Sequence, residues 1–223
     1  MLQRNAPITN PIKESRFVAA LFVSVGLLLL PTCSSRNNRT TVLEMSGQDE
    51  WRNGDLVFRC GMGAESRAVT AHGHSSYSHI GLLYRDTTNG QWLVIHAVPG
   101  EDEPEWLKTE PVEVFFGRDR ACAGAWATVD CSDSVANKAA LYALGKVAAH
   151  TLFDNAYRTA DTAQLYCTEL VWRSYLHAGM DVTGGKRHSV PTFFSREGEC
   201  IFPNDIEQSE TTLFVKPFKT KQL

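Results

Sequence analysis

The sequence has no basic block and no regular stripe of lysine or arginine: 22 basic residues stand against 25 acidic ones, and the net charge is −3. Nucleic acid binds proteins through clustered positive charge, so it is not an expected partner. Internal repeats and low-complexity segments are also absent. With 43% hydrophobic and 21% charged residues, the chain has the composition of a folded protein.

Close cysteine pairs are missing as well. None of the six cysteines forms a CxxC pair, so we expect no structural zinc site. His72, His74 and His79 straddle a loop and have no distant acidic partner motif, so we expect no other metal and no cofactor. Apart from Cys33 and Cys167, four cysteines remain that an exported protein could pair in three ways or keep as buried thiols: Cys60, Cys122, Cys131 and Cys200.

The N-terminal apolar run, residues 17–30, is short for a membrane span, which needs about 20 residues. It follows a flank containing Arg4, Lys13 and Arg16, which is the layout of a bacterial secretory signal. The run ends in Leu-Pro-Thr-Cys33, which resembles a bacterial lipobox with Thr where Gly, Ala or Ser is preferred. We therefore predict a leader over residues 1–33, with lipidation of Cys33. An ordinary cleaved signal and an uncleaved anchor are the alternatives.

This leader predicts an exported, periplasmic protein of a bacterium, held at the membrane through an N-terminal lipid. Residues 34–50 are polar and have no hydrophobic period, so we predict a flexible tether there. The remaining residues, 51–223, are predicted to form one catalytic domain.

Residues 51–223 contain strand patterns that are segregated from helical ones. Alanine-rich residues 134–150 and residues 166–177 are predicted as helices, the second ending near Gly179. Such segregation indicates the α+β class. The predicted strands cover residues 56–59, 79–84, 92–98, 111–116, 125–129 and 212–215.

Two short segments carry the chemistry. Ser-Tyr-Ser-His79 places a histidine at the start of an apolar strand, and Leu-Tyr-Cys167-Thr-Glu places a cysteine where a helix begins. A thiol is mostly protonated at neutral pH, but a helix N-terminus and a nearby imidazole can both activate it. We therefore predict that Cys167 is a nucleophile and that His79 is its base.

A third residue is expected to orient the base. His79 begins the strand before the Asn89-Gly90 turn, and His96 lies near the end of the strand after it. If the two strands pair about this turn, the histidines meet at one end of the hairpin. His96 would then accept a hydrogen bond from His79. The plainer interpretation is that Cys167 and His79 are packed core residues, as lone cysteines and histidines usually are.

The segments together resemble the permuted NlpC/P60 superfamily of papain-like proteins, in particular its YiiX/YebB-like branch. Phe153-Asp154 also resembles that family's approach to its cysteine. Four blocks carry the resemblance in the expected order: Gly54-Asp-Leu-Val-Phe58, Ser78-His-Ile-Gly81, Val94-Ile-His-Ala97 and Leu165-Tyr-Cys-Thr-Glu-Leu-Val171.

The resemblance implies a circularly permuted papain-like fold, an antiparallel sheet packed against helices. It implies that Cys167 is the nucleophile, His79 the base and His96 the polar third residue, with Tyr166 as a substrate-binding residue of the pocket. The branch often has Glu at the third position, whereas His is the residue of standard NlpC/P60 enzymes.

The implied activity is cleavage of an amide or peptide bond in the cell envelope, for which a peptidoglycan stem peptide is one substrate. The alternatives are a lipid esterase or acyltransferase of the lecithin:retinol acyltransferase type, and a lipoprotein that binds wall or lipid without catalysis.

Overall fold

The computed structural model describes residues 41–100, 104–160, 162–192 and 197–222. The predictions for the leader, Cys33 and residues 34–40 lie outside these ranges. No helix in the described ranges combines the length and the hydrophobicity that crossing a membrane requires.

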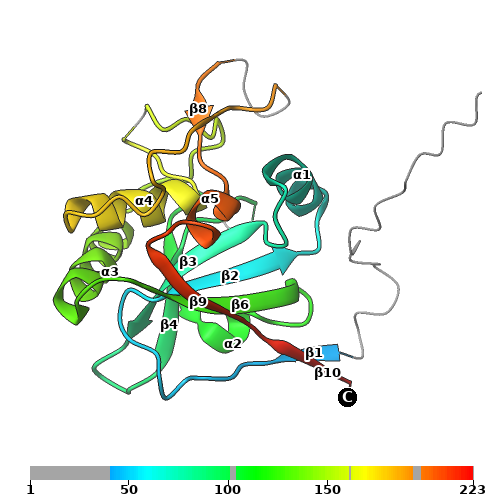
Figure 1. Ribbon diagram of the computed structural model, residues 1–223, viewed down its shortest axis with the longest axis vertical. Coiled ribbons are helices and arrows are strands. Elements are labelled where there is room, and N and C mark those ends of the chain that lie inside the picture. Colours follow the sequence, from blue (N-terminus) through cyan, green and yellow to red (C-terminus); the bar gives the residue numbers. More distant parts are fainter. Residues whose placement is uncertain (1–40, 101–103, 161, 193–196, 223) are drawn as a thin grey trace, which may run out of the picture. The chain divides into compact units, whose positions relative to one another are not determined.

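A six-stranded antiparallel sheet is the centre of the fold, with strand order β5-β4-β3-β2-β6-β9 (Figure 1). β3 and β4 form the predicted hairpin, whose turn closes through a hydrogen bond from the amide of Asp86 to the carbonyl of Gln91. The strands are β2 (Leu56–Gly61), β3 (His79–Arg85), β4 (Trp92–His96), β5 (Lys108–Pro111), β6 (Ala121–Val129) and β9 (Thr212–Pro217).

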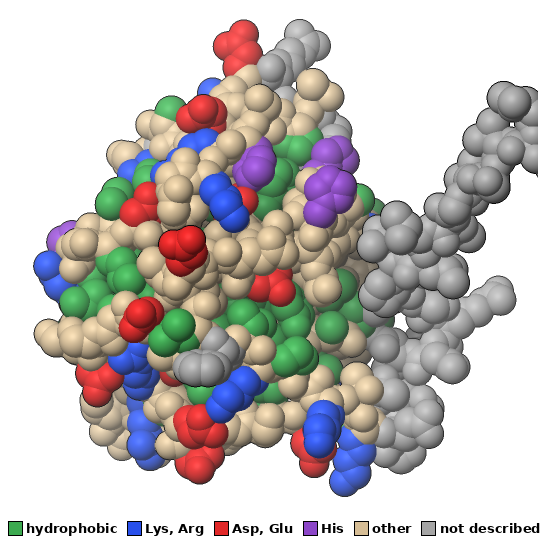
Figure 2. All heavy atoms as spheres, in the orientation of Figure 1, with side chains coloured by type: hydrophobic (Ala, Val, Ile, Leu, Met, Phe, Trp, Pro, Cys, Tyr) green, Lys and Arg blue, Asp and Glu red, His purple; other side chains and the backbone are tan. Residues whose placement is uncertain are grey.

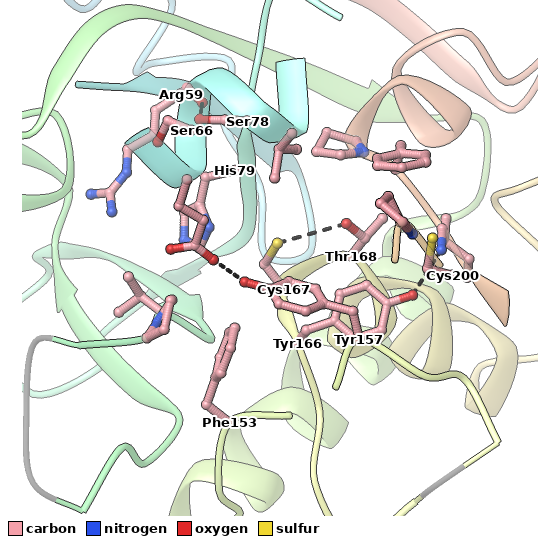
Figure 3. A pocket seen from close by; sticks show the side chains of 18 residues that line it. Arg59, Ser66, Ser78, His79, Phe153, Tyr157, Tyr166, Cys167, Thr168 and Cys200 are labelled. Carbon is pink, nitrogen blue, oxygen red and sulfur yellow. Dashed lines mark hydrogen bonds between the residues drawn. The ribbon is translucent and has the colours of Figure 1, made fainter. Parts of the chain in front are cut away.

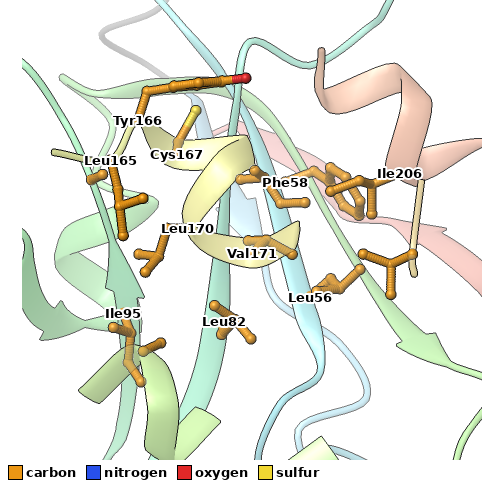
Figure 4. Close-up of a cluster of buried hydrophobic side chains, with 14 of the residues drawn as sticks. Leu56, Phe58, Leu82, Ile95, Leu165, Tyr166, Cys167, Leu170, Val171 and Ile206 are labelled. Carbon is orange, nitrogen blue, oxygen red and sulfur yellow. The ribbon is translucent and has the colours of Figure 1, made fainter. Parts of the chain in front are cut away.

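One face of the sheet packs against the two longest helices, α3 (Asp133–Ala148) and α4 (Cys167–His177). Leu170 and Val171 of α4 lie against alternate residues of the central strands, among them Leu56 and Leu82 (Figure 4). Alternation explains this arrangement, because residues two apart on a strand share a face. The shorter helix α1 (Ala64–Gly73) follows β2 near the end of the sheet where β3 begins (Figure 1), and α5 (Pro203–Glu207) precedes β9, with Ile206 in the cluster that contains Leu56 (Figure 4).

The opposite face has its own apolar cluster. Val57, Leu83 and Val94 of the sheet pack there with Phe115 of the short helix α2 (Val112–Phe115). Both faces of the central strands are therefore covered, which explains why their sequences are almost continuously apolar. On the face of the molecule shown in Figure 2, acidic and basic side chains are interspersed.

The α+β prediction is confirmed, as a large antiparallel sheet packs against helices. The strand predicted over residues 111–116 is wrong, because β5 ends at Pro111 and α2 follows. The apolar residues Val112 and Phe115 are three apart, so one helical turn buries both against the sheet.

Two further pairs of short strands lie outside the six-stranded sheet in the described ranges. β7 (His188–Ser189) pairs with β8 (Glu199–Cys200), and β1 (Thr41–Glu44) pairs with β10 (Lys219–Gln222). β1 falls within the segment predicted as a tether, so that prediction is wrong for residues 41–44. Strand pairing with the other end of the chain satisfies its backbone groups, and this partner cannot be seen from local polarity.

Candidate active site

A pocket of about 80 Å³ lies where α4 begins, close to the first residue of β3. Cys167 and His79 both line it (Figure 3). The two residues are 88 positions apart in the sequence, and the packing of α4 against β3 brings them to the same pocket. The walls are mainly apolar and come from several loops: Val98, Pro99, Phe153, Tyr157, Ile201 and Phe202.

Cys167 is the first residue of α4, as predicted, and its side chain is buried. Tyr166 before it has an extended backbone, with φ −93° and ψ 173°, so the helix begins sharply at the thiol. Burial raises the pKa of the Cys167 thiol above its usual value, although hydrogen bonds from Thr168 and from the Ile80 amide oppose this. The thiol is therefore protonated at rest.

His79 and His96 meet at one end of the β3–β4 hairpin. The distance from His79 Nε2 to His96 Nδ1 is 2.9 Å, and the two rings are nearly perpendicular. Both side chains are buried, and both pack against the ring of Phe115. Burial, reinforced by the charge of Arg59, lowers the pKa of His79 well below its usual value, and burial also lowers that of His96. Both rings are therefore neutral.

Gly81 leaves the space that this contact needs. A methyl group on Gly81 would lie 2.5 Å from Val94 Cγ1 and 3.2 Å from the Cβ atom of His96. A real side chain at this position would therefore push β4 away from β3. The close packing of β3 against β4 thus explains why the Ser-His-Ile-Gly block has glycine at position 81.

Glu110 is a member of this cluster that the sequence analysis did not identify. Its Oε1 atom lies 3.2 Å from His96 Nε2. Its Oε2 atom accepts a hydrogen bond of 2.9 Å from Arg120. Burial opposes ionisation, but His96, Arg120 and Arg59 outweigh it and lower the pKa of Glu110 below the usual carboxyl value. The group is therefore a carboxylate, and His79, His96 and Glu110 form one connected series beside the pocket that Cys167 lines.

Tyr166 lines the pocket, where the sequence analysis predicted it. Its hydroxyl also accepts a hydrogen bond of 2.8 Å from the amide of Ile201. The ring is buried, so this bond attaches the segment after β8 to the start of α4. The residue therefore positions one wall of the pocket in addition to lining it.

Tyr157 was also missed. Its hydroxyl donates a hydrogen bond to the carboxylate of Glu65 on α1, and both residues line the pocket. The backbone of Tyr157 is left-handed, with φ 54°. Asp154 supports this turn by accepting hydrogen bonds from the amides of Ala156 and Arg158. The Phe153-Asp154 block thus holds a tyrosine over the pocket.

The other cysteines do not take part. Cys60, Cys131 and Cys200 are free thiols, so no disulfide forms among these and Cys122. Burial raises the pKa of Cys200, which lines the same pocket, to about 12. Within the described ranges, no group of three His, Cys, Asp or Glu side chains could hold a metal ion.

The arrangement suits nucleophilic chemistry at a carbonyl group. A protonated thiol needs a base to accept its proton, and a neutral imidazole is such a base. The first turn of α4 also offers backbone N–H groups and the positive end of its dipole to a developing oxyanion.

A family model described as the permuted papain-like amidase enzymes, YaeF/YiiX, C92 family, matches residues 50–214. A comparison with curated proteins finds no match. Among solved structures, the chain is similar to one described as the metalloprotein yiiX from Escherichia coli O157:H7. The likeness covers 77% of this chain and 98% of that one, with 19% identity and a TM-score of 0.59, and it shows a shared fold.

The family match covers most of the chain and includes the hairpin, the pocket and α4. It gives the chain the activity of a cysteine hydrolase of the amidase type. The chain belongs to the permuted papain-like amidases of the YaeF/YiiX, C92 family.

Proposed function

We propose that the protein cleaves an amide bond through Cys167 as nucleophile, His79 as general base and His96 as the residue that orients the base. One observation carries this proposal. A thiol at the start of α4 shares a pocket with His79, and the other nitrogen of His79 is already engaged by His96.

In the first step, the Cys167 thiol gives its proton to Nδ1 of His79 while the sulfur attacks the amide carbonyl. The N–H groups at the start of α4 stabilise the resulting oxyanion. The imidazolium then protonates the leaving amine, the C–N bond breaks, and a thioester on Cys167 remains. Water, deprotonated by His79, hydrolyses the thioester to a carboxylic acid and restores the thiol.

The pocket favours an apolar group on the acyl side of the bond. Phe153, Tyr157 and Phe202 line it, and they would bury an alkyl or aromatic group at about 25 cal/mol per Å². A polar peptidoglycan stem peptide gains less from such walls. Within the cell-envelope role expected from the leader, we therefore infer an amide with an apolar acyl group as the substrate class.

The same walls favour a second candidate, a lipid esterase or acyltransferase. Both reactions pass through a thioester on Cys167, and they differ in the group that leaves or arrives. An ester releases an alcohol, which needs less assistance from the imidazolium than an amine does.

A matched set of substrates tests these candidates. The purified protein is incubated with an N-acyl amide, an ester of the same acyl chain and a muropeptide. We expect turnover of the amide that disappears in Cys167→Ala and remains in Cys60→Ala, a half-buried thiol outside the pocket. Faster cleavage of the ester would favour the second candidate. Binding without turnover of any of the three would show a non-catalytic envelope protein.

A further inference from the structure

Glu110 reaches the catalytic cluster because of strand register. β5 pairs with β4 so that Glu110 lies opposite Val94, and Val94 is two residues before His96. Residues two apart on a strand point to the same face. His96 and Glu110 therefore share a face and are diagonal neighbours, within reach of long side chains.

The contact between these two residues is buried. The His96 side chain has no solvent exposure and that of Glu110 has 9%. His96 Nε2 and Glu110 Oε1 lie 3.2 Å apart, at ion-pair distance, and neither atom makes an aligned hydrogen bond within the part of the chain that the structure describes. A buried polar atom without a partner is costly, so each of these atoms depends on the other.

The chemistry of neutral imidazole gives this contact a direction. One ring nitrogen carries a proton and donates, and the other accepts. A carboxylate only accepts, so His96 must place its proton on Nε2, toward Glu110. Its Nδ1 is then an acceptor, and His79 must donate from Nε2 across the 2.9 Å contact. This leaves Nδ1 of His79 without a proton.

We propose that Glu110 is a positioning residue that, through His96, fixes the tautomer of His79 in which Nδ1 is free to accept the thiol proton. This inference rests on the proposed function, because it assigns the base of that reaction to one nitrogen. Glu110 acts at a distance from the thiol, through its buried contact with His96 and then the hydrogen bond between His96 and His79.

Glu110 also has a structural role, which an experiment must separate from the positioning role. It forms an ion pair with Arg120 at 2.9 Å and lies 3.9 Å from Arg59. Losing these contacts would lower stability, and it would not by itself change where the histidines carry their protons. The position of the imidazole protons is therefore the readout that distinguishes the two roles.

Long-range ¹H–¹⁵N NMR of the ¹⁵N-labelled protein reports which imidazole nitrogens are protonated. At neutral pH we expect both His79 and His96 to carry the proton on Nε2. A wild-type spectrum with the His96 proton on Nδ1 would overturn the proposal without any variant.

Glu110→Gln removes the group that fixes which nitrogen of His96 carries the proton. An amide can donate to His96 Nε2 as well as accept from it. We expect a population of the Nδ1–H tautomer of His79 to appear in this variant. The control is Glu113→Gln, the same change at an exposed position three residues away, which should leave the wild-type spectrum.

Kinetics supply the second readout. Loss of a carboxylate that fixes a catalytic tautomer costs on the order of 10⁴ in kcat when the contact is direct. With one histidine between, we expect Glu110→Gln to lower kcat about 10- to 100-fold and to change KM less than about twofold. Unchanged tautomers together with unchanged kcat would overturn the proposal.

The rate at which iodoacetamide alkylates Cys167 separates this proposal from the proposed function, because it needs no substrate. If His79→Ala slows alkylation and Glu110→Gln does not, His79 remains the base and the role of Glu110 is refuted. If His79→Ala has no effect on alkylation or turnover, the proposed function itself fails. Slower alkylation in both variants, with a normal rate in Glu113→Gln, is the result that we expect.

Discussion

The Nε2 atom of His79 lies 2.9 Å from the Nδ1 atom of His96, across neighbouring strands of the β3–β4 hairpin. A neutral imidazole has only two ring nitrogens, so this contact determines which one is left for the thiol. The proposed base is therefore Nδ1 of His79, and its ring is held by a residue that is itself buried.

Removal of the base, His79, should lower kcat more than removal of His96, which orients it. General acid–base assistance contributes about 10² to 10⁴ in rate, so His79→Ala should lose at least 100-fold in kcat. His96→Ala should lose less, and His96→Glu should retain part of the activity because a carboxylate can also accept the hydrogen bond from Nε2 of His79. Steady-state kinetics on one amide substrate decide the order. A larger loss in His96→Ala than in His79→Ala would reverse the two roles.

Gly81→Ala should disturb both stability and catalysis. Its methyl group would lie 2.5 Å from Val94 Cγ1, and overpacking of this kind typically costs about 1 to 3 kcal/mol. Gly145→Ala is the matched control, since that exposed position in α3 has no atom within 4 Å of an added methyl group. It should gain roughly 0.5 to 1 kcal/mol from helix propensity. Urea unfolding should therefore show a lower free energy of unfolding for Gly81→Ala and a higher one for Gly145→Ala. Changes of the same sign in both variants would contradict the steric role of Gly81.

Stability should fall as the pH drops below 6.5. Burial, then the charge of Arg59, lowers the pKa of His79 in the folded state, whereas the unfolded chain titrates near 6.5. The stabilisation is thus complete above pH 6.5 and is lost below it, because the unfolded state binds more protons there. Lys108 acts in the same direction on both histidines, and Glu110 opposes it at His96.

The loss should reach at most about 1.4 kcal/mol per pH unit for each histidine. Urea unfolding at about pH 7.5 and about pH 5.5 measures it. The difference in free energy of unfolding between the two pH values should shrink in His79→Gln. It should persist in His72→Gln, a change at an exposed histidine of α1. An identical pH dependence in all three proteins would refute the assignment of neutral buried histidines.

Tyr157→Phe should open the pocket. The change removes only the hydroxyl that bonds to Glu65, so α1 and the loop after Phe153 lose their direct connection. Bulky maleimides should then label Cys167 several-fold faster, while small iodoacetamide should change little. Tyr142→Phe, on α3 outside the pocket, is the control. If the two reagents respond equally in Tyr157→Phe, the contact does not restrict access.

The export prediction needs a direct measurement. Mass spectrometry of the native N-terminus should find a chain that begins at Cys33 and carries lipid. A chain that begins after another cleavage site would support an ordinary signal, and an unprocessed cytoplasmic chain that begins at Met1 would refute export.

The hairpin could be predicted from the sequence because its information is local. Asn89-Gly90 specifies the turn, and strand alternation then brings His79 and His96 to the same end. Cys167 at the start of α4 was also predictable, since the apolar spacing of residues 166–177 shows where the helix begins.

Glu110 could not be predicted in the same way. Residues 97–107 separate β4 from β5, and the Pro99-Gly100 turn within so long a connection does not fix the register that places Glu110 opposite Val94. Tyr157 was missed because a left-handed tyrosine has no sequence signature of its own. The strand predicted over residues 111–116 was wrong because Val112, Val114 and Phe116 alternate as in a strand, while Val112 and Phe115 share one helical turn, and the helix is what forms.

A Cys167 thiol that is protonated at rest should react slowly with oxidants. Peroxide and disulfide exchange attack cysteine as its thiolate, so a nucleophile that is protonated until a substrate reaches it is a poor target for oxidants. No second cysteine would be needed to rescue it from a sulfenic acid. Such an enzyme can keep its nucleophile reduced in oxidising surroundings and deprotonate it only when a carbonyl carbon is in place to react.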